Sequence, residues 1–436
     1  MNREAPPGEE SALKDEELAT EAAGVAVEHE RWRGATFRAL RHRNYRLYFL
    51  GQMVSLVGSW MQTTALLWLT DQLTHEARWT TAVAAATMLP AFFFGAWGGL
   101  LTELRPRRTI IIWTQSALLL QALLLAALVT WGNPTPWALL ALATASGLIN
   151  AVDLPARLGF IVEMANHEDL PNAVALNSML FNVARAVGPL LTGTLLTTVG
   201  PAFCFFLNSL SFVAVIVALA LMRLPAHVPI PAKHVGLRAI LAAFAELVRR
   251  PQLGVVLGLV AMMSIFGWPS QGLLPKLARE GLRLTEDTWG YPLLLCGAGV
   301  GAVLAALTTA SLTSERWRRP ILCCGIALAA TGLLGLSIAP GLPVALVCNG
   351  LVGFGLILFM ATSQSVVQLG VDDGNRGRIM GIWSMVLNGA VPLGNLLAGP
   401  AADWWTVPVV LGMQGAGCTV ALAAAVGCLR VREKTI

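Results

Sequence analysis

Twelve long apolar segments constrain the fold of this chain more than any other feature of its sequence. Each is long enough to cross the ~30 Å hydrocarbon core of a lipid bilayer. In lipid, only helices and closed barrels satisfy every backbone N–H and C=O group, and apolar runs of this length form helices. The sequence therefore predicts an all-α integral membrane protein with twelve transmembrane helices, over residues 46–70, 79–102, 108–131, 137–162, 172–198, 201–222, 253–276, 288–312, 319–339, 342–369, 378–401 and 404–429.

The composition agrees with a chain that is solvated mainly by lipid. Of the 436 residues, 56% are hydrophobic and 13% are charged, whereas a soluble chain carries roughly 25% charged residues. The seven cysteines lie within apolar segments, so we expect them to act as packing residues without a disulfide framework. The six histidines are not spaced like metal ligands, and no phosphate-binding Walker loop occurs. We therefore expect no metal, no cofactor, no use of ATP and no enzyme activity.

The two halves of the chain repeat one another. The pattern S-M-x-x-N, followed by G-x-L-L-x-G, occurs at 178–193 and again at 384–399. Such a repeat predicts two pseudo-symmetric six-helix bundles with a transport site between them near the bilayer midplane. The predicted domains are a cytoplasmic tail with an amphipathic pre-helix, an N-terminal bundle, a cytoplasmic linker, a C-terminal bundle and a C-terminal tail, over residues 1–45, 46–222, 223–252, 253–429 and 430–436.

The distribution of basic residues predicts the orientation in the membrane. Nearly all lysines and arginines fall on one side of the predicted membrane, and only Arg78, Lys276, Arg279 and Arg283 fall on the other. The positive-inside rule therefore predicts that both termini are cytoplasmic.

The first 45 residues change character midway. Residues 1–30 hold nine carboxylates and no apolar stretch, which indicates a tail without a cleavable signal peptide. Residues 31–45 alternate arginine with Trp32, Phe37, Leu40 and Tyr45. This pattern favours a helix on an anionic membrane surface over a patch that binds nucleic acid.

Arg185 is the most informative single residue, because it lies ~20 Å along the segment 172–198, near its midpoint. A charge at this depth costs at least ~2.5–3.5 kcal/mol and normally faces protein or a water-filled cavity. Asp153 is the only acid well inside an apolar segment, about level with Asn182 on the next segment. We expect Asp153 to pair with Arg185, and Arg157 at i+4 is the alternative partner. The alternative for Arg185 is a purely structural role in packing. The same alternative applies to Asp153 and its partner.

Amide side chains and one tryptophan complete the predicted cavity for substrate or coupling ion. Trp268 is included because Pro269 and Gly272 interrupt the helix beside it, whereas most other tryptophans are expected to face lipid or its interface. Beyond Asp153 and Arg185, the predicted cavity residues are Gln52, Gln62, Asn150, Asn177, Asn182, Trp268, Gln271, Gln364 and Asn388.

After about residue 35 the chain resembles the major facilitator superfamily, and two motifs carry the resemblance. The loop G-G-L-L-T-E-L-R-P-R-R resembles that superfamily's signature loop, with Gly99, Glu103, Arg107 and Arg108 at its key positions, although Leu104 and Pro106 depart from the pattern. The resemblance implies that this loop controls conformational switching. A-V-G-P-L-L-T-G resembles the signature of exporters, and it implies helix packing through Gly188, Pro189 and Gly193.

The runs D-L-P-A-R, L-P-N-A-V-A-L-N-S and N-V-A-R-A-V-G-P are similar to a subgroup of bacterial exporters that handles siderophores and macrolides. This resemblance implies a monomeric, proton-coupled exporter of the bacterial inner membrane that moves a bulky amphipathic small molecule, such as a drug or siderophore, by alternating access. Its partners would be that substrate, protons and membrane lipid, and not nucleic acid. An importer of a small nutrient and a non-transporting membrane receptor or scaffold are the alternatives.

Overall fold

The computed structural model describes residues 37–164, 168–223, 251–284, 289–311, 317–371 and 373–430. Every regular element within these ranges is helical. The long helices match the predicted segments closely because continuous apolar runs in lipid leave the backbone one way to pair its polar groups. In chain order the elements are η1 (Arg38–Arg41), α2 (Arg43–Thr74), α3 (Ala77–Leu104), α4 (Arg107–Trp131), α5 (Pro136–Met164), α6 (Leu170–Thr198), α7 (Pro201–Ala220), α9 (Pro251–Phe266), α10 (Ser270–Lys276), η2 (Leu277–Gly281), α11 (Gly290–Ser311), α12 (Arg318–Ser337), α13 (Leu342–Leu369), α14 (Asp373–Trp404) and α15 (Val407–Arg430).

Ten spans in the described ranges are long and apolar enough to cross a membrane. Helices α9, α10 and η2 count as one of these spans, and α2 and α3 are not among the ten. The predicted segment 253–276 is interrupted between Phe266 and Ser270. Pro269 explains the break, because it has no N–H to donate and its ring disfavours the preceding helical turn.

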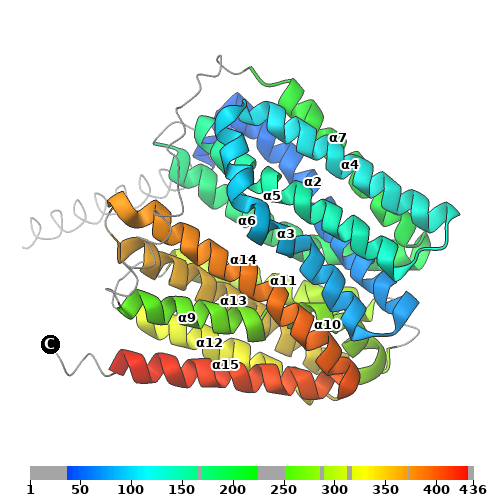
Figure 1. Ribbon diagram of the computed structural model, residues 1–436, viewed down its shortest axis with the longest axis vertical. Coiled ribbons are helices and arrows are strands. Elements are labelled where there is room, and N and C mark those ends of the chain that lie inside the picture. The colour runs from blue at the N-terminus through cyan, green and yellow to red at the C-terminus, as the bar shows by residue number, and fades with distance from the viewer. Residues whose placement is uncertain are drawn as a thin grey trace, which may run out of the picture.

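The helices pack as two groups, α2–α7 (the first group) and α9–α15 (the second group), which Figure 1 shows one above the other. Most close packing lies within a group, as between α2 and α7 or between α12 and α13. Two pairs of helices make the main contacts across the groups, α3 with α14 and α6 with α11. The groups converge toward the end of the molecule where α10 lies (Figure 1).

The sequence repeat has a structural counterpart. Asn182 donates from Nδ2 to the carbonyl of Ser178 at 2.9 Å, and Asn388 donates to the carbonyl of Ser384 at 2.8 Å. The last glycine of each repeat lies where the two groups touch. A Cβ at Gly193 would meet the ring of Trp289 before α11, and a Cβ at Gly399 would meet the backbone of the first turn of α3. The repeat therefore marks the equivalent contacts of α6 with α11 and of α14 with α3.

The chain before α2 is fixed to the start of α6. Arg38 and His42 both contact the carboxylate of Asp169, at 2.6 and 2.7 Å. Tyr45 belongs to α2, is buried, and donates its hydroxyl to the carbonyl of Ala173 at 2.7 Å. The expectation that Tyr45 faces a membrane surface is therefore wrong. Trp32 and the rest of 31–36 lie outside the described residues, as does the acidic tail.

Candidate functional site

Arg185 lies between two tryptophan rings. Its guanidinium carbon is 5.5 Å from the centre of the Trp60 ring and 4.9 Å from that of Trp268. Trp60 belongs to α2 in the first group, and Trp268 lies in the turn between α9 and α10 in the second. Only 4% of Arg185 is exposed, so both contacts are cation–π interactions largely removed from solvent. The predicted mid-membrane arginine is thus buried between the two groups.

Asp153 belongs to a different cluster, inside the first group. Its carboxylate forms an ion pair with Arg157 Nε at 2.7 Å and accepts hydrogen bonds from Thr114 (2.5 Å) and Gln115 (3.1 Å) on α4. Arg157 also donates to Gln52 Oε1 on α2 at 2.9 Å. The predicted ion pair between Asp153 and Arg185 is therefore wrong, and the alternative partner Arg157 is the observed one. Within the described ranges, no carboxylate lies at ion-pairing distance from Arg185.

The predicted cavity residue Gln62 lies in a buried hydrogen-bonded network. Its Oε1 accepts from Asn208 on α7 at 2.8 Å, and its Nε2 donates to Gln121 on α4 at 3.1 Å. Gln121 in turn donates to the carbonyl of Leu142 on α5 at 3.1 Å. Both ends of the Gln62 amide are thus occupied by links among helices of the first group.

The other predicted amide side chains fall into two sets, those with a buried polar atom that has no hydrogen-bond partner and those without such an atom. Three have a buried polar atom with no hydrogen-bond partner in the described chain, namely Gln52 Nε2, Asn182 Oδ1 and Gln271 Nε2. Asn150 donates within its own helix, to the carbonyl of Ser146. Asn177 and Gln364 are half-buried. Because buried polar atoms in proteins are normally hydrogen-bonded, the three orphaned atoms mark places where a ligand or water would bind.

The predicted switch loop contacts the ends of α5 and α7. Arg107 donates to the carbonyl of Gly159 at 2.8 Å and pairs with Glu163 at 3.0 Å, and Arg108 donates to the carbonyl of Ala220 at 3.1 Å. The side chain of Glu103 lies outside the described residues.

Helix α3 approaches α5 closely at Gly98, the residue before the signature position Gly99. A Cβ at Gly98 would clash with the carbonyl of Ala151 on α5, whereas a Cβ at Gly99 would meet nothing within 4 Å. In helix α6, a Cβ at Gly188 would meet Trp60 and the backbone of α2, so this predicted packing glycine does allow a close approach.

A set of charged residues, which we call the end cluster, joins the two groups where α2 ends and α3 begins. It consists of Asp71, Lys276, Arg279 and Asp403. Arg279 forms a two-point ion pair with Asp71, at 2.8 and 3.1 Å, and also donates to the carbonyl of His75. The Asp71 side chain is 2% exposed and that of Arg279 is 14% exposed. This pair is therefore a buried salt bridge between the first group and the second.

Asp403 in the end cluster caps a helix of the other group. Its carboxylate accepts hydrogen bonds from the backbone N–H groups of Ala77 (2.7 Å) and Arg78 (3.0 Å), the first residues of α3. Glu76, the residue before α3, makes no side-chain cap of its own. Lys276 binds the same carboxylate at 2.6 Å. A carboxylate at a helix N-terminus satisfies unpaired N–H groups and interacts favourably with the helix dipole.

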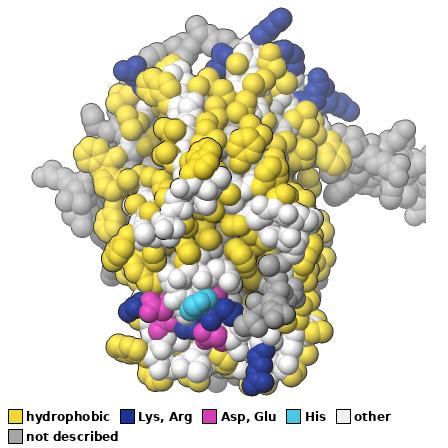
Figure 2. Space-filling view, turned by 90° about the vertical axis from the view of Figure 1, so that its right-hand side faces the viewer, with side chains coloured by type: hydrophobic (Ala, Val, Ile, Leu, Met, Phe, Trp, Pro, Cys, Tyr) yellow, Lys and Arg dark blue, Asp and Glu magenta, His cyan; other side chains and the backbone are white. Residues whose placement is uncertain are grey.

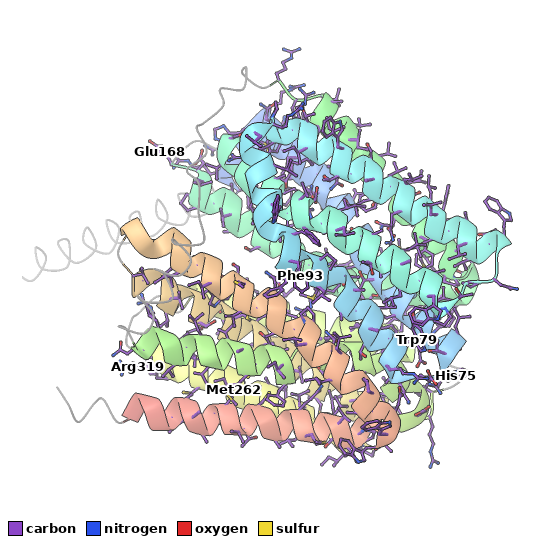
Figure 3. The ribbon with its side chains drawn as sticks, in the orientation of Figure 1. His75, Trp79, Phe93, Glu168, Met262 and Arg319 are labelled. Carbon is purple, nitrogen blue, oxygen red and sulfur yellow. The ribbon has the colours of Figure 1, made fainter. Side chains whose placement is uncertain are left out.

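The end cluster was not predicted from the sequence. Its residues sit at the ends of apolar segments on one side of the predicted membrane, which was a usable signal, but their pairing joins residues hundreds of positions apart. Figure 2 shows acidic, basic and histidine side chains gathered low on a largely hydrophobic face. In Figure 3, His75 and Trp79 lie at this end, and Glu168 and Arg319 lie at the opposite end.

Comparisons with known proteins agree with this architecture. The family described as transmembrane secretion effector matches residues 34–435. The chain is 22% identical to the staphyloferrin A transporter of Staphylococcus aureus, over 85% of this chain and 92% of that protein. It is 26% identical to the multidrug efflux pump Tap of Mycolicibacterium fortuitum, over 82% and 88% of the two chains. It is 25% identical to the enterobactin exporter EntS of Escherichia coli, over 79% and 81%.

Solved structures share the fold at low sequence identity. The nucleoside transporter NupG superposes with a TM-score of 0.68 at 17% identity, over 89% of this chain and 98% of its own. A bacterial homologue of the human lysosomal transporter Spinster superposes with a TM-score of 0.66 at 13% identity, over 88% and 95%. The family match covers nearly the whole chain, and relatives and structural neighbours alike are transporters. The chain therefore belongs to the transmembrane secretion effector family of the major facilitator superfamily, and it is a multi-pass membrane transporter rather than an enzyme.

Proposed function

We propose that this protein is a secondary active exporter that moves a bulky amphipathic small molecule out of a bacterial cell by alternating access. The proposal places twelve spans in two six-helix bundles, 46–222 and 253–429, with both termini in the cytoplasm and a monomer as the working unit. The names of its relatives support export, because they include an enterobactin exporter and a multidrug efflux pump. The exporter-like run with Gly188 and Gly193 in α6 supports the same direction.

The observation that carries the proposal is that the ion pairs described between the two groups all lie at one end of the molecule. At the end cluster, the pair of Asp71 with Arg279 crosses between the groups. At the opposite end, the ion pairs in the described residues, such as Arg38 with Asp169 and Arg107 with Glu163, stay within the first group. Halves that are joined by a buried salt bridge at one end are suited to rocking about a central site when that salt bridge breaks.

The distribution of lysine and arginine supports a periplasmic position for the end cluster. The described conformation is then closed toward the periplasm, and opening requires the end cluster to break. Glycine contacts support such a movement, because Gly399 allows a close approach of the first turn of α3 and Gly193 leaves room for the ring of Trp289, so small residues lie at both contacts between the groups.

We assign proton coupling to Asp153. It is fully buried, and its ion pair with Arg157 connects α5 to Gln52 on α2. Protonation of Asp153 would release Arg157 from its partner and so change how α2, α4 and α5 are held together. A buried carboxylate that couples a proton to helix packing is the form that proton relays take in transporters.

Transport by purified protein in liposomes tests the proposal. A set of dyes and siderophores would be offered outside vesicles with an acidic interior. An exporter that exchanges protons for substrate accumulates substrate under this gradient, and a protonophore abolishes the accumulation. Accumulation only with an acidic exterior would indicate an importer, and absence of gradient-driven flux for every compound would indicate a receptor or scaffold. Asp153→Asn should lose accumulation while keeping substrate exchange at equal pH.

A further inference from the structure

We propose that Arg185, Trp60 and Trp268 form a recognition site for an organic anion, so that the transported molecule carries a carboxylate or similar planar oxyanion beside an aromatic surface. This inference rests on the proposed function, because the ligand is taken to be the substrate. It goes further by giving that substrate a charge and a shape.

The charge of the site follows from what surrounds Arg185. Its guanidinium is buried, and the carboxylate nearest to it in depth, Asp153, is already paired with Arg157 and bonded to Thr114 and Gln115. In the described part of the chain, Arg185 contacts aromatic faces instead of an acid. A buried cation without an anion is strongly unfavourable. The negative faces of two indole rings compensate it in part, and a bound anion would compensate it more fully.

The shape of the site follows from which group supplies each ring. Trp60 is held in the first group with Arg185, and its ring also packs edge-on against Phe181 of α6 at 5.6 Å. Trp268 comes from the second group, beside the helix break at Pro269. When the groups move apart, Trp268 leaves the guanidinium and Trp60 stays. An incoming anion would then take the place of the Trp268 ring, while its aromatic part stacks on Trp60. The planar guanidinium fork matches a carboxylate in two-point geometry.

Two orphaned polar atoms belong to residues that lie close in the chain to Arg185 and to Trp268. Asn182, one turn before Arg185 in α6, has a buried Oδ1 with no hydrogen-bond partner in the described residues. Gln271, which follows Trp268 by three residues, has a buried Nε2 that also lacks a hydrogen-bond partner in the described residues. One is an acceptor and the other a donor. A ligand with hydroxyl or amide groups near its anionic group could form hydrogen bonds with both atoms. An anion without such groups could not.

Binding of two dyes with a common core tests the charge of the site. Fluorescein is an anion, and the methyl ester of rhodamine is a cation on the same xanthene core. Equilibrium dialysis against detergent-purified protein would give the affinity for each dye. We expect the native protein to prefer fluorescein. In Arg185→Gln, the affinity for fluorescein should fall by about 10- to 100-fold, the range expected for loss of charged hydrogen bonds, while the affinity for the cation stays equal or rises.

The controls separate a local site from a general charge effect. Arg283→Gln removes one positive charge from an exposed position in the second group and should leave both affinities unchanged. Arg185→Lys keeps the charge and loses the fork, so it should bind fluorescein several-fold more weakly and still prefer it to the cation. If Arg185→Gln does not fold, the dye preference of Arg185→Lys tests the proposal instead. A native preference for the cation, an equal loss of both dyes in Arg185→Gln, or a folded Arg185→Lys without anion preference would overturn the proposal.

The dye-binding experiment and the transport experiment can contradict the anion site and the proposed export separately. A protein that binds fluorescein through Arg185 without gradient-driven flux would contradict export and support the anion site. A protein that exports the cationic dye equally well with and without Arg185 would contradict the anion site and support export.

Discussion

The salt bridge between Asp71 and Arg279 should hold the two groups together at the proposed periplasmic end, and Asp71→Asn tests this directly. The change preserves the size of the side chain and removes its charge. In the closed conformation, Arg279 would remain buried beside a neutral amide. In an open conformation, both residues would face water, so the substitution would have little effect there. The variant should therefore shift the conformational equilibrium toward the open state.

The magnitude follows from the burial of the pair. Removing one partner of a buried ion pair costs roughly 3–5 kcal/mol. Arg279 keeps its bonds to the carbonyl of His75 and to Glu280, and its side chain retains 14% exposure. We therefore expect a smaller loss of about 2–3 kcal/mol in the closed state, which corresponds to a roughly 30- to 150-fold change in the ratio of closed to open molecules. A change of this size converts a mostly closed population into one with both states well represented.

Pulsed electron paramagnetic resonance between two spin labels would measure the populations. Leu73 at the end of α2 and Trp405 after α14 are exposed and belong to different groups. Cysteines at these positions would be labelled in a protein whose native cysteines are replaced, because Cys324 is exposed and would react. Asp71→Asn should add a second, longer distance to the distribution.

Glu280→Gln provides a matched control. Glu280 pairs with the same arginine at 2.9 Å, but it is 49% exposed and lies in the second group with it. Exposed pairs contribute roughly 0–1 kcal/mol, and this one does not cross between the groups. The distance distribution should therefore stay close to that of the native protein. An unchanged distribution in Asp71→Asn, or an equal shift in Glu280→Gln, would refute the assignment of this salt bridge as the lock.

Three further predictions concern other parts of the molecule. Asp153→Ala and Arg157→Ala should each lower the free energy of unfolding by about 3 kcal/mol, and the double variant should lose less than the sum of the two. The losses from Asp153→Ala and Arg185→Ala should instead be additive. Thermal unfolding in detergent measures both cycles, and additive losses for Asp153 and Arg157 would contradict the observed pair. Arg107→Gln should slow transport several-fold and leave equilibrium substrate binding nearly unchanged, and a selective loss of binding would argue against a switching role. A cysteine at Asn133, exposed between α4 and α5, should react with a membrane-impermeant reagent added to intact cells, while cysteines at the two termini should not; labelling of the N-terminus from outside would reverse the orientation.

Much of the helical architecture was predictable, because lipid restricts the backbone so strongly. The segment predicted at 108–131 is α4 at Arg107–Trp131, and the one predicted at 342–369 is α13 at Leu342–Leu369. Pro269 likewise predicted the interruption after α9. The burial of Arg185 followed from depth alone, since a charge in the middle of an apolar run has few stable environments other than protein.

The partners of buried charges were not predictable in the same way. Depth along the helix places Asp153 within reach of both Arg157 and Arg185, and the choice depends on the direction of each side chain around its helix axis. The hydrogen bonds from Thr114 and Gln115 on α4 also favour the observed position, and one sequence does not reveal them. Trp60 was missed because tryptophans in membrane helices usually face lipid interfaces. In this chain, a buried cation holds that ring between helices.

The capping of α3 by Asp403 has a consequence for the dependence of the transporter on water. When the groups separate, the amides of Ala77 and Arg78 lose their acceptor, and the carboxylate keeps only Lys276. Asp71 and Arg279 lose each other in the same step. All of these groups must then bind water, so opening is a hydration reaction as well as a movement of helices. Osmolytes excluded from protein surfaces favour states with less exposed surface. We therefore expect the resting conformation to follow the osmotic strength on the side of the membrane where the end cluster lies, with concentrated surroundings holding that end shut.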